Sequence, residues 1–206
     1  MKRLLFIIAC LLPFLSFSQN EGPRRVSLGV RSTVSLFNHG SDDDAGYGAG
    51  GQIRIRLTDR INTEWFADFL TSRSSNLGFR NDAHIGWSVM YYLKDTEQFT
   101  RKFTPYLIAG HCFDYTKVEA FVDPDIQFVQ AQQTEASRWS SAVQAGLGSH
   151  YNLTPRLDVS LSAQYMMHFG NHIHIEGDLP VPYVVEEDHS GVEGHLLVSL
   201  SMNIKL

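Results

Sequence analysis

The sequence has little of three things: cysteine, long apolar runs and excess positive charge. Beyond residue 18, Cys112 is the one cysteine, so no internal disulfide can brace the fold. That part of the chain also has no run of about 18 to 20 apolar residues, which a membrane helix needs. Acidic residues number 22 against 17 basic ones. This balance argues against nucleic acid as a partner.

The amino-terminal segment has the pattern of an export signal. Lys2 and Arg3 precede an apolar run at residues 4–15, and small residues lie just before Gln19. We expect residues 1–18 to be a signal peptide for Sec-dependent export, cleaved after Ser18. Residues 19–206 are then of a size that suits one domain.

The clearest pattern in the remaining chain is a strict alternation over residues 139–169. Most odd positions are apolar or aromatic and most even positions are small or polar, which is the period of a β-strand. Ser141 and Ser149 are the polar exceptions on the apolar face. A break at residues 154–156, which contain Pro155, supplies a turn. The segment therefore predicts two long strands joined as a hairpin.

Aromatic spacing indicates what the apolar face of this hairpin contacts. Trp139 and Tyr151 lie twelve residues apart on that face. A strand that rises ~3.3 Å per residue and tilts by ~40° separates them by roughly 30 Å along the barrel axis. Outer-membrane barrels have an apolar band about 25 Å tall between two aromatic girdles. Because lipid tolerates only helices and closed barrels, the hairpin predicts a barrel.

Alternation elsewhere predicts six more strands. The expected strands cover residues 26–37, 46–58, 61–70, 83–93, 103 to about 115, 139–152, 157–169 and 192–206. Long connections are expected at residues 38–45, 71–82, 116–138 and 170–191, tight ones at 58–60 and 154–156, and an intermediate one at 94–102. The predicted fold is all-β: an eight-stranded antiparallel up-and-down transmembrane β-barrel with short periplasmic turns and long extracellular loops.

Three segments carry a family resemblance: F-T-P-Y-L-I-A-G at residues 103–110, A-G-L-G-S-H-Y-N-L-T-P-R-L-D-V-S-L at 145–161, and the alternating carboxyl end. They resemble the small eight-stranded outer-membrane β-barrel family of Gram-negative bacteria, which includes the membrane domain of OmpA. The resemblance implies a place in the outer membrane, with lipid, lipopolysaccharide and the barrel-assembly machinery as partners and no cofactor. Many such barrels end in an aromatic residue, whereas this chain ends in Leu206.

The even positions predict a polar lumen. An eight-stranded barrel is just filled by its side chains, so charges of both signs there predict a packed, hydrogen-bonded plug. If residues 57 and 61 are opposite each other, Arg54 is opposite Glu64. A narrow gated pore is the alternative. The expected lumen network is Arg54, Arg56, Glu64, Asp68, His84, Gln144, His150 and Gln164, and Arg31, Asp158, His168, Glu193, His195 and Lys205 share its face.

The odd positions predict the membrane girdle. In the fifth strand the parity is in conflict, because an inward Gly110 turns Leu107, Ala109 and Phe113 toward lipid together with His111. The expected girdle residues are Trp65, Trp87, Tyr91, Trp139, Tyr151, Tyr165 and Phe169.

Candidate metal ligands alternate at His172, His174 and Glu176, which lie on one side if the segment is extended. Imidazole and carboxylate suit zinc, but no fourth ligand follows at a defined spacing, so we predict no metal. The acidic groups at residues 42–44 and at 123 and 125 match no EF-hand, so we interpret them as solvated loop charge.

The stretch His168-Phe169-Gly170-Asn171 is similar to the His-x-Ser-Asn stretch of the lipid A deacylases, with glycine in place of serine. Because the serine hydroxyl is the nucleophile, we predict no enzyme.

The leading hypothesis is a non-catalytic barrel that displays loops at the cell surface in an adhesion, envelope or recognition role. An uptake barrel for a small hydrophobic molecule is the second hypothesis, with Met90, Tyr92, Met166 and Leu197 as candidate lining residues. A lipid A-modifying enzyme is the third. A soluble lipocalin-like barrel, with the apolar face turned inward, is the fourth.

Overall fold

The computed structural model describes residues 25–37, 45–74, 77–94, 103–121, 133–177 and 182–206. The expected signal peptide lies outside the described residues, and so do the acidic groups at residues 42–44, 123 and 125. The described part of the chain forms eight strands and no helix that is long and apolar enough to cross a membrane. The strands are β1 (Val26–Phe37), β2 (Gly46–Arg56), β3 (Ile61–Ser74), β4 (Gly78–Tyr92), β5 (Phe103–Ala120), β6 (Glu135–Asn152), β7 (Leu157–Glu176) and β8 (Tyr183–Lys205).

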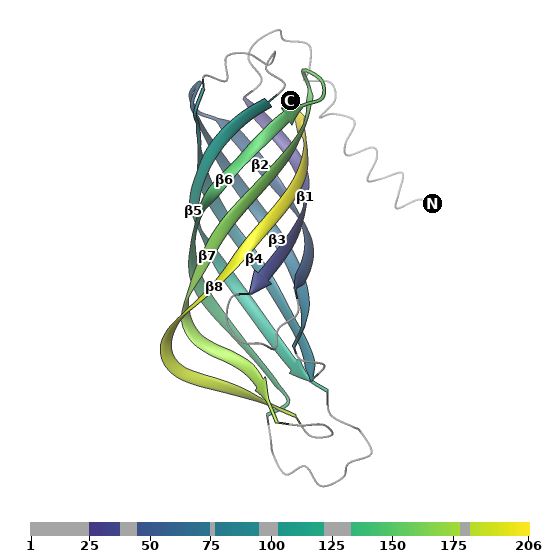
Figure 1. The fold of residues 1–206 in the computed structure, drawn as a ribbon, viewed down its shortest axis with the longest axis vertical. Helices are drawn as coiled ribbons and strands as arrows, with labels where there is room; N and C mark the ends of the chain where they lie inside the picture. Colours follow the sequence, from purple (N-terminus) through teal and green to yellow (C-terminus); the bar gives the residue numbers. More distant parts are fainter. Residues whose placement is uncertain (1–24, 38–44, 75–76, 95–102, 122–132, 178–181) are drawn as a thin grey trace, which may run out of the picture.

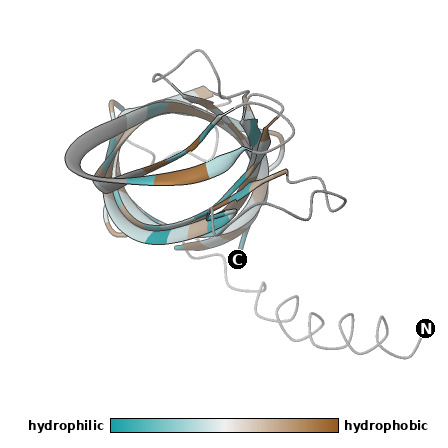
Figure 2. Ribbon diagram, turned by 90° about the horizontal axis from the view of Figure 1, so that it is seen from below, coloured by the Kyte–Doolittle hydropathy of each residue, from teal (hydrophilic) through white to brown (hydrophobic). Residues whose placement is uncertain are grey.

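The strands close into a barrel. Each pairs antiparallel with its neighbour in sequence, and β1 pairs with β8 from Ser27↔Lys205 to Phe37↔His195. Figure 1 shows the strands tilted around a common axis, and Figure 2 shows the closed ring along that axis. The predicted up-and-down barrel is confirmed.

Two tight turns repeat one local sequence. Residues 57–61 read L-T-D-R-I and residues 153–157 read L-T-P-R-L. In each, the threonine hydroxyl accepts hydrogen bonds from two backbone N–H groups, at 3.2 and 3.0 Å both for Thr58 and for Thr154. A side chain that bonds its own turn in this way stabilises the reversal. Both turns lie at the barrel end where β1 begins and β8 ends.

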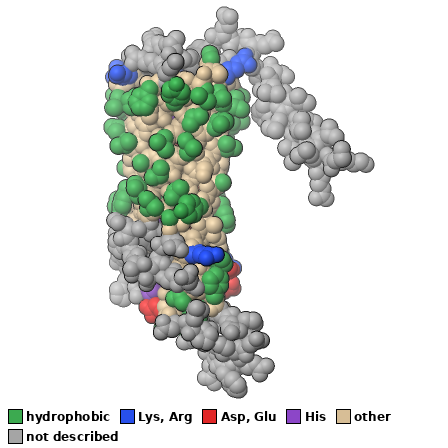
Figure 3. Space-filling model, turned by 45° about the vertical axis from the view of Figure 1, so that its right-hand side comes forward, with side chains coloured by type: hydrophobic (Ala, Val, Ile, Leu, Met, Phe, Trp, Pro, Cys, Tyr) green, Lys and Arg blue, Asp and Glu red, His purple; other side chains and the backbone are tan. Residues whose placement is uncertain are grey.

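Exposure separates the two faces of the wall. Trp139, Val30 and Tyr151 are 69%, 68% and 48% exposed, whereas Arg54 is 5% exposed. Hydrophobic side chains form a band around the barrel and charged side chains gather at its ends (Figure 3). The soluble lipocalin-like alternative is therefore wrong, because it requires the apolar face to fill the interior.

The fifth strand keeps its parity, and its polar outlier has a partner. Leu107, Ala109 and Phe113 face outward, and so does half-buried His111. His111 Nε2 lies 2.7 Å from the Oγ of Ser141, a polar residue on the outward face of β6. The two outward polar side chains are therefore paired with each other. This pairing stabilises the wall, because burying an unpaired polar group against lipid costs free energy.

Several strands are longer than predicted. The segments 71–74, 78–82, 116–120, 135–138, 170–176 and 183–191 were expected to be loops and are strands. Polar residues there conceal the pattern because the inward face is polar and outward residues such as Lys117 and Glu119 are polar too. Ser72, Arg80, Asp82 and Thr116 still alternate into the interior. β5 to β8 have 18, 18, 20 and 23 residues, against 12 and 11 in β1 and β2.

The longer strands form a partial wall beyond the end of the barrel opposite the tight turns (Figure 1). The pairing of β7 with β8 shifts register between Gly170 and His172, and such an irregularity bends a strand pair. Past this bend, a small apolar cluster joins Val118, Ala136, Ile173 and Val184 from four strands. The extension therefore has a core of its own.

Candidate functional site

Six charged side chains form a continuous chain through the barrel interior, with acids and bases in alternation. The ion-pair distances are 3.1 Å for Arg31–Asp68, 3.2 Å for Arg31–Glu64, 2.7 Å for Arg54–Glu64, 3.5 Å for Arg54–Asp158 and 3.4 Å for Lys205–Asp158. The six side chains come from β1, β2, β3, β7 and β8. Three carboxylates balance three cations, which makes the buried charge tolerable.

Arg54 is the centre of this chain. Its cross-strand partner is Glu64, so the predicted register is confirmed. Its Nη2 donates to Ser160 and Ser201 at 3.3 Å each, and its Nη1 lies 3.3 Å from His150 Nδ1. One guanidinium therefore contacts four strands, which ties the walls of the barrel together.

Apolar layers lie among the polar groups. Met90 and Tyr92 pack with Tyr106 and Ile108, and the Tyr92 hydroxyl lies 2.8 Å from His150 Nε2. Met166 and Leu197 belong to a separate cluster with Phe66, Leu70, Cys112 and Ala142. The four candidate lining residues of an uptake pocket are therefore packed in two clusters and do not line one cavity.

A second polar cluster lies farther toward the long-strand end. It combines His84 from β4, Asp114 from β5, His168 from β7 and His195 from β8. His84 Nε2 lies 3.1 Å from Asp114 Oδ1, and His168 Nδ1 lies 2.9 Å from Asp114 Oδ2. Asp114 Oδ2 also accepts from Ser140, at 3.2 Å. All of these side chains are buried.

The remaining residues of the expected lumen network are placed as follows. Gln144 is buried and donates to Ser88 Oγ at 2.9 Å, and Gln164 is buried. Arg56 lies at the rim, where it pairs with Asp59 of the tight turn at 2.5 Å. The side chain of Glu193 lies outside the description. Arg56 is therefore spatially separate from the interior chain.

The three candidate metal ligands that were read from the sequence lie on the extension of β7. The segment is extended, and His174 Nε2 is 2.9 Å from Glu176 Oε1. The Tyr183 hydroxyl donates to the other oxygen of Glu176, at 3.2 Å. Hydrogen bonds from His174 and then Tyr183 hold the pKa of Glu176 below its usual value. The side chain of His172 lies outside the description.

The aromatic residues expected in the girdle all lie on the outer wall and are exposed. Trp65 on β3 and Trp87 on β4 are cross-strand partners within the wall. Trp139 packs against Tyr115, with ring centroids 5.0 Å apart and the ring planes tilted by 49°. Tyr151 is paired with Phe103, near the tight-turn end.

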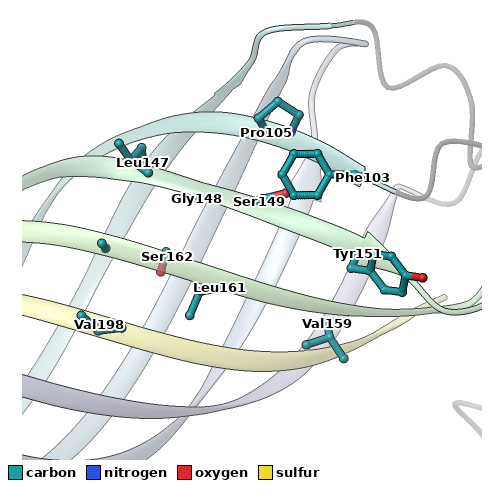
Figure 4. A pocket seen from close by; sticks show the side chains of 11 residues that line it. Phe103, Pro105, Leu147, Gly148, Ser149, Tyr151, Val159, Leu161, Ser162 and Val198 are labelled. Atoms are coloured by element: carbon teal, nitrogen blue, oxygen red, sulfur yellow. The ribbon is translucent and has the colours of Figure 1, made fainter.

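A groove of about 510 Å³ lies on the outer wall over β5 to β8. Figure 4 shows Phe103, Leu147, Tyr151 and Leu161 around it, with Pro105 at one edge. Its lining is almost wholly apolar. In a bilayer such a groove would face acyl chains.

The histidine and aspartate cluster was not predicted as a unit. Parity alone places His84, His168 and His195 on the inward face, and it places Asp114 there once Gly110 is inward. Strand parity carries no information on which residues meet across the lumen. The barrel's closure and shear determine that contact.

Comparison with known proteins agrees with this architecture. The family model described as outer membrane protein beta-barrel domain matches residues 4–185. No curated protein sequence matches. Similar solved structures include a major outer membrane protein from Thermus thermophilus, with a TM-score of 0.59 and 13% identity over 87% of this chain and 98% of that one.

Two further structures are similar over most of their length. Neisserial surface protein A has a TM-score of 0.54 and 13% identity, over 88% of this chain and 97% of that one. The outer membrane protein OprG from Pseudomonas aeruginosa has a TM-score of 0.54 and 14% identity, over 88% and 94%. At these identities the likeness shows the fold.

Proposed function

Because the chain belongs to the outer membrane protein beta-barrel domain family and so lies in the outer membrane, we propose that it is a non-catalytic integral barrel that displays its extended strands and loops at the cell surface. The plugged interior is the observation that carries this proposal. The alternating chain of six charges and two apolar clusters fill the space along which a solute would pass. The barrel then acts as a rigid support.

Strand length supports display on one side. A membrane-spanning strand needs about 9 to 11 residues. β1 and β2, with 12 and 11 residues, are long enough to span and little more. β8, with 23 residues, is about twice as long as a span requires. The excess lies at the end opposite the termini, and in barrels with an even strand number that end is extracellular.

Surface chemistry on the extension is that of a solvated face. Lys117 forms ion pairs with Glu119 and Glu135; Glu135 is exposed, and Lys117 and Glu119 are partly exposed. Hydrogen bonds from Lys117 to these carboxylates raise the pKa of the lysine. Charged groups at this level support contact with water and with an extracellular ligand, rather than with lipid.

The outward aromatic residues nearest the two ends of the membrane-spanning wall are the proposed membrane anchors. Tyr91 and Tyr151 lie near the tight turns, and Trp139 lies toward the extension. Aromatic rings of this kind sit at the headgroup level of outer-membrane barrels. Lipopolysaccharide on the outer side and the barrel-assembly machinery on the periplasmic side are the partners that this placement implies.

We also propose that residues 1–18 are removed on export. Sequencing of the amino terminus of the membrane-inserted protein is then expected to begin at Gln19. A sequence that begins at Met1 would contradict this boundary.

Conductance tests the plug. The mature protein, inserted into a planar bilayer, is expected to give no steady current, because paired charges and packed apolar layers occupy the lumen. A reproducible ohmic channel from the folded protein would contradict the proposal and favour the narrow-pore alternative.

Epitope tags test the direction of display. A tag inserted within residues 122–132 is expected to react with antibody on intact cells. The matched control is the same tag after Pro155 in the opposite turn, which is expected to react only after the outer membrane is permeabilised. The reverse labelling pattern would overturn the proposed orientation.

A further inference from the structure

Three imidazole rings converge inside the barrel. His84, His168 and His195 come from β4, β7 and β8 and are at most 1% exposed. One nitrogen from each lies within 4.8 Å of the others. His168 Nε2 and His195 Nε2 are 2.9 Å apart. Among the described side chains, this group of three has the spacing of metal ligands.

The other ring nitrogens face oxygen atoms. His84 Nε2 and His168 Nδ1 lie 3.1 and 2.9 Å from the two oxygens of Asp114, and His195 Nδ1 lies 3.0 Å from Ser35 Oγ. Histidines that bind a metal through one nitrogen almost always direct the other toward a carboxylate, a carbonyl or another oxygen. A single carboxylate thus serves two of the three rings.

Several buried atoms in this cluster have no hydrogen-bond partner. His84 Nδ1 has none, and the close contacts of His84 Nε2 and His168 Nδ1 with Asp114 lack hydrogen-bond alignment. Buried polar groups are nearly always paired, so a group of unpaired ones calls for a physical cause. An ordinary hydrogen-bonded core does not explain these unpaired groups. A bound ligand would explain them, since His84 Nδ1 is available to bind one.

Nearby charges favour a cation at this point. Asp114 supplies an anion in direct contact with two of the rings. Two interior arginines are engaged elsewhere: Arg80 pairs with Asp82 at 3.1 Å, and Arg31 pairs with Asp68 at 3.1 Å. The three imidazoles beside one carboxylate therefore offer three nitrogen ligands and one compensating negative charge.

We propose that His84, His168 and His195 bind a divalent transition-metal ion, and that Asp114 is a positioning residue that orients two of the rings. Three imidazoles are a known zinc ligand set, and imidazole also suits copper and nickel. The ion would join β4, β7 and β8 at the level where the long strands continue beyond the shorter ones. It would therefore stiffen the base of the extension.

Metal binding to the untagged mature protein tests this proposal directly. The protein is refolded in detergent with Co²⁺ or Zn²⁺, freed of excess ion, and analysed for bound metal and for the visible absorption of Co²⁺. One ion per folded barrel and intense tetrahedral-type bands are expected. Heat-dependent gel mobility confirms that each sample is folded before metal is counted.

Variants assign the ligands. His168→Gln and His195→Gln are expected to lose stoichiometric binding, and Asp114→Asn to weaken affinity by about 10- to 100-fold. The matched controls are His150→Gln, an interior histidine in contact with Arg54, and His174→Gln on the extension. Both are expected to bind as the parent does. No ion on the folded parent, or equal binding by His168→Gln, His195→Gln and the parent, would overturn the site.

Discussion

Glu64 offers a quantitative test of the interior charge chain. Its carboxylate contacts Arg54 at 2.7 Å and Arg31 at 3.2 Å, and all three side chains are at most 5% exposed. Removal of one partner of a buried ion pair costs about 3 to 5 kcal/mol, because the other charge is stranded. Here Arg54 retains Asp158 at 3.5 Å and Arg31 retains Asp68. We therefore expect Glu64→Ala and Arg54→Ala each to lower the free energy of unfolding by ~3 kcal/mol.

The double variant separates pairing from general damage. Because each single change strands the other member, the loss in Arg54→Ala/Glu64→Ala is expected to fall short of the sum by about 1 to 3 kcal/mol. Reversible urea unfolding in lipid vesicles, followed by tryptophan fluorescence, measures each free energy. The rim pair Arg56–Asp59 is the control, with a coupling of at most ~1 kcal/mol. Additive losses at residues 54 and 64 would refute the reasoning.

Two further changes test the outer wall. Leu161→Arg, at a site 56% exposed within the apolar band, is expected to lower the free energy of unfolding in vesicles by ~2 to 4 kcal/mol. Leu57→Arg at the tight turn is expected to lower it by only ~0 to 1 kcal/mol. Equal losses in the same unfolding assay would contradict the assigned depths of the two residues. Ser141→Ala is expected to destabilise by ~1 to 3 kcal/mol because it strands His111, and His111→Leu/Ser141→Ala is expected to be nearly neutral. If the double variant is the less stable of the two, the outward pair does not act as described.

The period of two made much of this fold predictable. Parity assigned Arg54 to the interior and Trp139 to the outside, and the tight turn at residues 58–60 fixed the register that sets Arg54 opposite Glu64. These are local properties, since a turn and an alternation need only a few neighbouring residues. A barrel also leaves its pattern in every strand, so eight weak signals reinforce one another.

The outer parts of the strands were harder to predict. Residues 78–82 and 116–120 carry polar side chains on the inward face, and outward Lys117 and Glu119 are polar too, so apolar alternation fades although pairing continues. Backbone hydrogen bonds along the ladder still stabilise them. Polar composition was therefore a poor guide to where a strand ends.

Contacts between side chains across the lumen could not be predicted from the sequence. His84 and His168 lie on strands that are not neighbours, and their approach depends on strand tilt and shear. The sequence instead drew attention to His174 and Glu176, which are near each other in the chain. Proximity in sequence carries no information on which side chains a closed barrel brings together across its lumen.

The most direct test of the account is the depth of the three tryptophans in a bilayer. Trp65, Trp87 and Trp139 all lie on the outer wall and are 53%, 42% and 69% exposed. In single-tryptophan variants, lipids brominated along the acyl chain are expected to quench Trp65 and Trp87 strongly, and Trp139 is expected to respond most to bromine close to the headgroup. If none of the three is quenched by brominated acyl chains in the folded protein, the apolar band does not face lipid and the account is wrong.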